Sequence, residues 1–425
     1  MNRKLILGER IMYVNSTATV NCIFTAKVRG QLTLEGLIHA LAKVQQKHPL
    51  LGVVIREDEK GRPYFVSDTK IPPIPVQIKE RRSDDDWQLI SAEQWRQSFD
   101  VGKGPLARLI WLRSSEVSEL MLVCAHCICD GTSILTLMRE LLQVLDKPET
   151  RLITYPAFED IRTFIPDTLI NNAGLKIRLR LLSGLAWLVL RLKTRGKIPV
   201  PGNHYLVHFK MDKTTTARLA NRCKTEQTTM HAAFAVAFME AHRQVMGAAS
   251  HGKVISPVDI RRFIPEIKQD QLFAFAPIAE LSTSAEKGAD FWARARQLKN
   301  DLTDAIDKMD IRKLLFTSDY FHSAGKYMVR LLQQTEGTHD VTLSNMGRLD
   351  IPERYEHFVL ETIYSPSAAF PWRNANTLVI STFDGQADFS FISQEAFLPA
   401  EKARTILQQM QVLLSTNHQH EPAHQ

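Results

Sequence analysis

Residues 119–131 read ELMLVCAHCICDG, and this stretch lies at the centre of the predicted fold. Residues 120–125 are apolar without interruption, which is typical of a strand buried on both faces inside a sheet. Asp130 and Gly131 predict a turn, and apolar residues then recur at helical spacing as far as Leu145. A buried strand, a turn and an amphipathic helix in succession predict an α/β fold with this strand in the middle of a sheet.

The same alternation of strands and helices continues on both sides of this stretch. In the first half we expect strands at residues 11–13, 17–28, 50–56, 61–66 and 106–112, and a helix that begins after Thr33 and ends at His48-Pro49. In the second half we expect strands at residues 205–211, 253–258, 339–344, 358–364, 377–382 and 387–393. We expect four helices there: one that begins at Thr214, one that begins at Thr229, and two that cover residues 291–306 and 399–414. The pattern predicts two mixed sheets, each flanked by helices.

Pro199, Pro201 and Gly202 interrupt this pattern between the two halves and mark a boundary. We expect an N-terminal lobe over residues 1–165, a basic connector with its own helix over 166–202, and a C-terminal lobe over 203–415. The polar, histidine-rich residues 416–425 predict a flexible tail rather than a metal site.

The composition is that of a globular protein of 425 residues, with 44% hydrophobic and 23% charged residues. The apolar run after Lys4 is broken at Glu9, so the run is too short for a secretory signal. The apolar residues 181–190 are too few to span a bilayer, which needs about 20 apolar residues. The five cysteines are an odd number without paired spacing. We therefore expect reduced thiols in a cytoplasmic protein that is soluble or peripheral to a membrane.

A moderate basic excess, with a net charge of +7, is concentrated in the connector. No acidic residue occurs between Thr168 and Met211, where eight lysines and arginines fall. Three interpretations stay open for this block: a solvated helix face, a docking surface for an acidic carrier protein or coenzyme A phosphates, or a membrane-surface helix. We expect Lys176, Arg180 and Arg191 to be its docking residues. Nucleic acid is disfavoured, because no zinc, helix-turn-helix or aromatic-basic RNA signature accompanies the block.

His126 stands where the buried strand ends, a position at which α/β folds place chemistry. A neutral imidazole with a pKa near about 6.5 can take up a proton at neutral pH. From the residues alone, His126 is either such a base or a core histidine held by backbone atoms. Cys124, Cys127 and Cys129 surround it, but their spacing does not match a zinc site, so we expect no metal there and take them as small buried residues.

Residues His126-Cys-Ile-Cys-Asp130-Gly131 resemble the H-x-x-x-D-G motif of the chloramphenicol-acetyltransferase-like superfamily. That superfamily includes peptide condensation domains, polyketide-associated acyltransferases and alcohol acetyltransferases. Further segments resemble the family in the same order along nearly the whole chain: His48-Pro49-Leu50-Leu51, Gly104-Pro105-Leu106, residues 257–261, Ser344-Asn345-Met346-Gly347 and Phe383-Asp384-Gly385. Many relatives carry two consecutive histidines, whereas this chain has Ala125 before His126, which disfavours the peptide-condensation branch.

The resemblance implies two acetyltransferase-like lobes with an active-site tunnel between them and His126 as general base. The donor would be an acyl-CoA or the phosphopantetheine thioester of an acyl carrier protein, and the acceptor a small-molecule or lipid alcohol. No covalent intermediate and no tightly bound cofactor are implied, and we expect a monomer. Two alternatives are an amide-forming condensation enzyme with an amine acceptor and a non-catalytic pair of lobes that binds a carrier protein.

The resemblance also implies roles for residues around His126. Asp130 and Gly131 would be structural, with the carboxylate of Asp130 paired to an arginine; Arg261 is the candidate and Arg262 the alternative. Asn345 would either help to bind the oxyanion or shape a turn, and turn shaping is the simpler interpretation.

Overall fold

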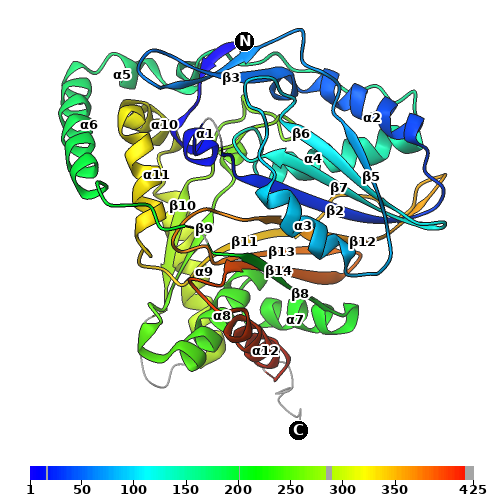
Figure 1. Ribbon diagram of the computed structural model, residues 1–425. Helices are drawn as coiled ribbons and strands as arrows, with labels where there is room; N and C mark the ends of the chain where they lie inside the picture. Colours follow the sequence, from blue (N-terminus) through cyan, green and yellow to red (C-terminus); the bar gives the residue numbers. More distant parts are fainter. Residues whose placement is uncertain (16–17, 201, 284–289, 417–425) are drawn as a thin grey trace.

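Two mixed β-sheets, one in each lobe, form the frame of the protein, and helices cover them (Figure 1). The structure is a computed structural model that describes residues 1–15, 18–200, 202–283 and 290–416. The predicted α/β fold with two sheet-containing lobes is confirmed. The histidines of the predicted tail fall within residues 417–425, outside the described residues.

The sheet of the N-terminal lobe has the strand order β12-β2-β7-β6-β5. Its strands are β12 (Val359–Ala368), β2 (Asn21–Arg29), β7 (Val117–Ala125), β6 (Ala107–Arg113) and β5 (Val76–Glu80). Strand β7 pairs antiparallel with β2 on one side and β6 on the other, and all its residues are buried. The uninterrupted apolar run thus lies in the interior of the sheet, as its sequence predicts.

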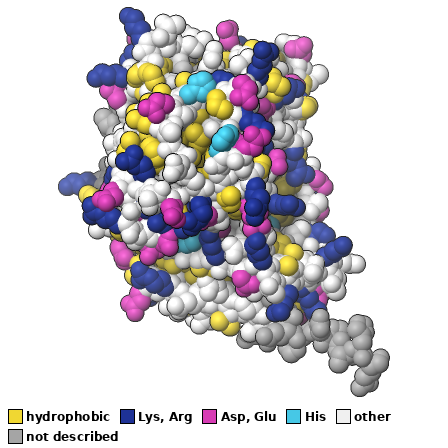
Figure 2. Space-filling model, turned by 90° about the vertical axis from the view of Figure 1, so that its right-hand side faces the viewer, with side chains coloured by type: hydrophobic (Ala, Val, Ile, Leu, Met, Phe, Trp, Pro, Cys, Tyr) yellow, Lys and Arg dark blue, Asp and Glu magenta, His cyan; other side chains and the backbone are white. Residues whose placement is uncertain are grey.

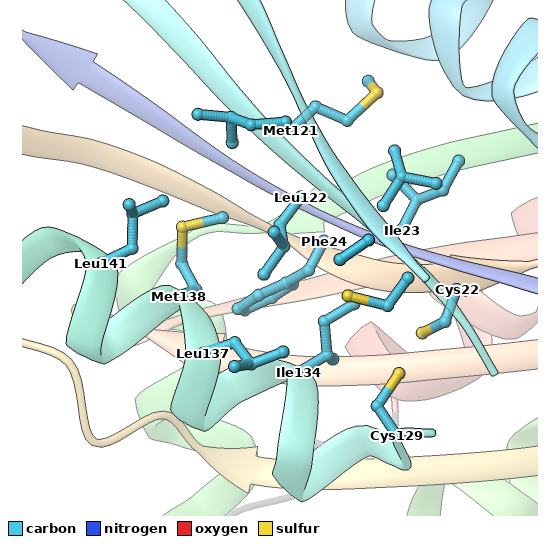
Figure 3. Packing of buried hydrophobic residues seen from close by; sticks show 14 of the residues in the cluster. Cys22, Ile23, Phe24, Met121, Leu122, Cys129, Ile134, Leu137, Met138 and Leu141 are labelled. Carbon is cyan, nitrogen blue, oxygen red and sulfur yellow. The ribbon is translucent and has the colours of Figure 1, made fainter. Parts of the chain in front are cut away.

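Helices α2 (Leu34–Lys47), α3 (Asp86–Arg96) and α4 (Gly131–Asp146) pack on this sheet or on one another. Figure 3 shows Ile134, Leu137 and Met138 of α4 facing Phe24 and Leu122 of the sheet. A smaller sheet, β1-β4-β3, consists of Asn2–Lys4, Pro63–Ser67 and Val53–Glu57. The packing of α4 on the sheet fixes the position of the turn that joins it to β7.

The sheet of the C-terminal lobe has the order β10-β9-β11-β13-β14-β8. Its strands are β10 (Ile278–Ser282), β9 (Lys253–Pro257), β11 (Val341–Arg348), β13 (Thr377–Phe383), β14 (Gln386–Gln394) and β8 (His204–Met211). Helices α7 (Lys213–Thr225), α8 (Met230–Met246), α9 (Phe291–Asp307) and α12 (Ala400–Thr416) belong to this lobe. The predicted cap at Thr229 is present, since its hydroxyl accepts a hydrogen bond from the backbone N–H of Ala232.

The connector contains α5 (Asp167–Ile170) and α6 (Ala173–Lys193). Helix α6 packs against α10 (Ile311–Tyr320), α11 (Gly325–Gln334) and the 3₁₀ turn η5 (Phe321–Ala324). Other 3₁₀ turns cover Pro49–Gly52, Ile161–Phe164, Gly247–Ala249 and Ile260–Arg262.

One prediction of secondary structure is wrong at the start of the chain. Residues 11–13 are not a strand but the end of helix α1 (Leu7–Tyr13). Its first turn is held by Glu9, whose carboxylate accepts a hydrogen bond from the Ile6 backbone N–H at 2.9 Å and from Arg3 at 2.8 Å. Both charged side chains are buried, so this local pair stabilises the helix.

The lobes are not divided cleanly in sequence. Strand β12 follows the C-terminal-lobe strand β11 in the chain, yet it pairs with β2 in the N-terminal sheet. Buried Asp388 on β14 joins the two sheets at this point, because its carboxylate accepts hydrogen bonds from the Ser365 backbone N–H of β12 at 2.6 Å and from His208 Nε2 of β8 at 2.7 Å. Residues 203–415 therefore contribute to both sheets.

We expect Asp388→Ala to lower the free energy of unfolding by at least about 2 kcal/mol, because a buried backbone donor and the partly buried ring of His208 lose their acceptor. Denaturant titration measures this. The matched control is Asp350→Ala, which removes an exposed carboxylate paired with Arg139 and should change stability by less than about 1 kcal/mol. Equal stability of the two variants would contradict a joining role for Asp388.

Candidate active site

The turn after β7 is built from backbone hydrogen bonds at both ends. The Ala125 N–H still donates to Leu106 O of the sheet, and the His126 N–H donates to Val20 O at 2.7 Å. The chain then turns, and Asp130 caps α4, with its Oδ1 accepting from the Ser133 backbone N–H at 2.8 Å. His126 is thus held between the end of a central strand and the start of a long helix.

The orientation of the imidazole ring of His126 follows from one hydrogen bond. Its Nδ1 lies 2.7 Å from the carbonyl oxygen of Cys129. Because a carbonyl oxygen only accepts, Nδ1 carries the proton, and Nε2 keeps its lone pair. Burial lowers the pKa of His126 from its ordinary value of 6.5, so the ring is neutral at pH 7. A neutral ring with an available Nε2 is the form that a general base requires.

Arg261 links Asp130 to the second lobe. Its Nη1 donates to Asp130 Oδ2 at 2.7 Å, and its Nη2 donates to Asp130 Oδ1 at 3.2 Å. Its side chain is fully buried; burial alone would lower the pKa of Arg261, but Asp130 and Asp259 raise it above its ordinary value. The other arginine weighed from the sequence, Arg262, is exposed and lies over the ring of Phe263.

Four further residues complete this network, and the sequence analysis did not identify them. Asp259 accepts hydrogen bonds from Arg261 at 3.1 Å and from Thr132 at 2.9 Å. Ser133 and the Gln271 carbonyl oxygen each accept from Arg261 Nη2 at 3.0 Å. Ser133 had a signal in the sequence, since it lies at the position that an N-cap aspartate binds. Asp259 lies in the segment 257–261 that resembles the family, but the resemblance gave it no role, and Gln271 had no signal.

Gly131 and Met346 meet from opposite lobes. A Cβ on Gly131 would lie 3.6 Å from Met346 Cε, so the end of β11 packs directly on the turn after His126. The Asn345 side-chain oxygen accepts from the Gly347 N–H at 2.9 Å, and Gly347 has a positive φ of 66°. The observed contact of Asn345 is therefore one that shapes a turn.

The cysteines around the turn are free and buried. Burial raises the pKa of Cys127 well above its ordinary range, which keeps it a neutral thiol. Within residues 1–15, 18–200, 202–283 and 290–416, no group of three or more His, Cys, Asp or Glu side chains is arranged to hold a metal ion.

The three predicted docking residues, Lys176, Arg180 and Arg191, are not part of this site. They lie on α6, at the edge of the molecule and away from β7 and α4 (Figure 1). Any effect of these cations on chemistry at His126 must therefore act from a distance.

Two family models match the chain. The condensation-domain model matches residues 12–158, which include His126, and the model described as phthiocerol/phthiodiolone dimycocerosyl transferase C-terminus matches residues 202–387, which include Arg261. Between them the two matches cover most of the chain. Among curated proteins, none has a sequence that matches this chain.

Several solved structures share this fold. Polyketide synthase associated protein 5 from Mycobacterium tuberculosis is similar over 98% of this chain and 97% of its own, with a TM-score of 0.67 and 16% identity. The trichothecene 15-O-acetyltransferase TRI3 from Fusarium sporotrichioides is similar over 97% and 94%, with a TM-score of 0.71 and 13% identity. The EpoB cyclization-docking bidomain from Sorangium cellulosum is similar over 100% and 87%, with a TM-score of 0.66 and 15% identity.

We expect Arg261→Gln to lower the free energy of unfolding by about 3–5 kcal/mol, because it leaves the carboxylate of Asp130 without its buried cation. The neighbouring exposed substitution Arg262→Gln is the matched control and should stay within about 0.5 kcal/mol of wild type. Thermal and denaturant unfolding of both variants measure the difference. A wild-type melting temperature for Arg261→Gln would contradict the network described here.

Proposed function

This chain is a member of the chloramphenicol-acetyltransferase-like superfamily, and from that premise we propose that it is an acyltransferase whose general base is His126. The observation that carries the proposal is the hydrogen bond between His126 Nδ1 and the Cys129 carbonyl oxygen. That bond sets the tautomer in which Nε2 can accept a proton, while burial keeps the ring neutral.

The proposed reaction is direct transfer without a covalent acyl-enzyme. His126 Nε2 takes the proton of the acceptor hydroxyl as the oxygen attacks the thioester carbonyl. The tetrahedral intermediate then collapses, the carbon–sulfur bond breaks, and the imidazolium returns the proton to the leaving thiolate. Base catalysis of this kind contributes about 10²–10⁴-fold, and positioning of both substrates between the lobes, in the tunnel that we propose there, contributes further.

Asp130, Gly131 and Arg261 have positioning roles in this proposal. The ion pair of Asp130 with Arg261 fixes the first turn of α4, and the carbonyl of Cys129 immediately precedes that turn. Gly131 packs beside Met346 at the turn. Asn345 shapes the facing turn of β11 and is not assigned to the oxyanion.

We propose a thioester donor, either acyl-CoA or the phosphopantetheine arm of an acyl carrier protein, and an alcohol acceptor. Transfer to oxygen is favoured because one matching model describes a dimycocerosyl transferase and one structural neighbour is a 15-O-acetyltransferase. Amide formation with an amine acceptor is the second candidate, and the condensation-domain match over residues 12–158 supports it. Ala125, in place of the first histidine of many relatives, weighs against it.

His126→Ala should reduce acyl transfer at least about 100-fold without lowering the melting temperature, because it removes the base and little packing. The assay is mass spectrometry of products formed from acyl-CoA and acyl-carrier donors with panels of alcohols and amines. His251→Ala, at an exposed histidine, is the matched control and should keep wild-type activity. A folded His126→Ala protein that keeps more than about a hundredth of wild-type kcat would contradict the assignment.

The pH dependence of kcat/KM should report the lowered pKa of His126. The base acts only when neutral, so activity should stay constant as the pH falls to about 6.5 and decline only below it. The profile is measured at pH values where circular dichroism shows an intact fold. An acidic limb with its midpoint above about 7 would assign the titration to another group.

A further inference from the structure

Helix α6 has its apolar stripe on the outside. Along Ala173–Lys193, apolar residues recur at positions i, i+4, i+8, i+11 and i+15, which form one face of a helix. These five residues are between 46% and 70% exposed: Ile177, Leu181, Leu185, Leu188 and Leu192. In a globular domain such a stripe normally packs against the core, whereas the apolar stripe of α6 is exposed to solvent.

The opposite face of α6 is firmly docked, so the stripe cannot rotate inward. Buried Leu179 packs in a cluster with Leu315 and Phe316 of α10. At the C-terminal end, Arg330 Nε donates to the Thr194 carbonyl oxygen at 3.1 Å, and Arg330 Nη2 donates to the Gly196 carbonyl oxygen at 3.1 Å.

Cations border the stripe, and no acid accompanies them. Arg178 and Arg180 flank it in the first half of the helix, and Arg191 and Lys193 flank it in the second. No Asp or Glu occurs between Thr168 and Met211. On the face that Figure 2 shows, which is the right-hand side of Figure 1 and lies away from α6, basic and acidic side chains are interspersed.

A basic recess opens at the C-terminal end of α6. Its volume is about 340 Å³, and it is lined by Arg191, Thr194, Arg195, Lys326, Tyr327 and Arg330. Four of these six residues are cations and none is an acid. The recess therefore suits a phosphate group.

We propose that α6 binds to the surface of an anionic lipid bilayer. The helix lies in the plane of the interface, its leucine stripe enters the boundary between headgroups and acyl chains, and the flanking arginines contact headgroup phosphates. One headgroup phosphate occupies the recess. Among the described residues, no helix is long and apolar enough to cross a membrane.

The combination of features favours a membrane over a protein partner. An apolar groove on another protein, or a second copy of this chain, would cover the leucines but would not require cations on both flanks. An acidic carrier protein would engage the cations but would not require five exposed leucine and isoleucine side chains. A continuous anionic bilayer meets both requirements at once.

The test is co-sedimentation of the full chain with vesicles of phosphatidylcholine alone and of phosphatidylcholine mixed with phosphatidylglycerol. We expect at least tenfold stronger binding to the anionic vesicles. The triple variant Leu181→Ser, Leu185→Ser, Leu188→Ser should bind at least tenfold more weakly, with an unchanged melting temperature. Arg178→Glu with Arg180→Glu should also weaken binding, and salt near about 1 M should weaken wild-type binding to a similar degree.

Matched controls distinguish binding through α6 from binding through exposed apolar or basic side chains elsewhere on the protein. Leu89→Ser with Val412→Ser changes two apolar residues that are equally exposed elsewhere, and Lys224→Glu with Lys402→Glu changes two exposed lysines on other helices. Both double variants should bind like wild type. His126→Ala should also bind like wild type, since the proposal does not depend on the chemistry at that residue.

Three outcomes would overturn the proposal. The first is wild-type binding that does not distinguish anionic from neutral vesicles. The second is a dimer in light scattering that dissociates in the triple serine variant while no vesicles bind, because a second copy would then cover the stripe. The third is binding of an acidic acyl carrier protein, lost with Arg178→Glu and Arg180→Glu, in the absence of any vesicle binding.

Discussion

Arg261 reaches from the turn after β9 to Asp130 at the start of α4, and its guanidinium is fully enclosed there. A buried cation is tolerated only when anions and acceptors surround it, which Asp130, Asp259 and the Gln271 carbonyl oxygen do. Asp130 at the same time caps α4 and so fixes the carbonyl that precedes it. The hydrogen bond from His126 to that carbonyl thus depends on a residue of the other lobe.

The same dependence of one lobe on the other is visible in the sheets. Strand β12 leaves the C-terminal half of the chain to pair with β2, and Asp388 ties it to β14 and β8. Met346 of β11 packs on Gly131, so the turn that carries the base is enclosed from both lobes. A site assembled in this way keeps its geometry only while the two lobes stay docked, which suits catalysis by positioning.

Local sequence predicted the central strand, the turn at Asp130 and Gly131 and the helix that follows, because each of these depends on residues close in the chain. That Asp130 itself caps this helix is shown only by the structure. The family resemblance gave Arg261 as the partner of Asp130 and kept Arg262 as the alternative, because only the backbone of the turn decides which of the two points inward. A strand was predicted at the position of β12, but its membership of the N-terminal sheet was not. The alternation of apolar and polar residues along this strand is compatible with either sheet. Residues 11–13 form a helix and not the predicted strand, because Glu9 pairs with Arg3 and with the Ile6 backbone N–H and so stabilises the helix that begins at Leu7. The sequence shows the leucines of α6, but which of them are exposed to solvent depends on how α6 packs against α10 and α11.

Catalysis as proposed requires that the protein hold His126 neutral, with its proton on Nδ1 and its lone pair on Nε2. NMR spectroscopy of protein labelled with ¹⁵N-histidine observes this directly, and the signals of His126 are assigned by their loss in His126→Gln. We expect the neutral Nδ1–H tautomer at about pH 7. A ring protonated on Nε2, or an imidazolium at that pH, would contradict it.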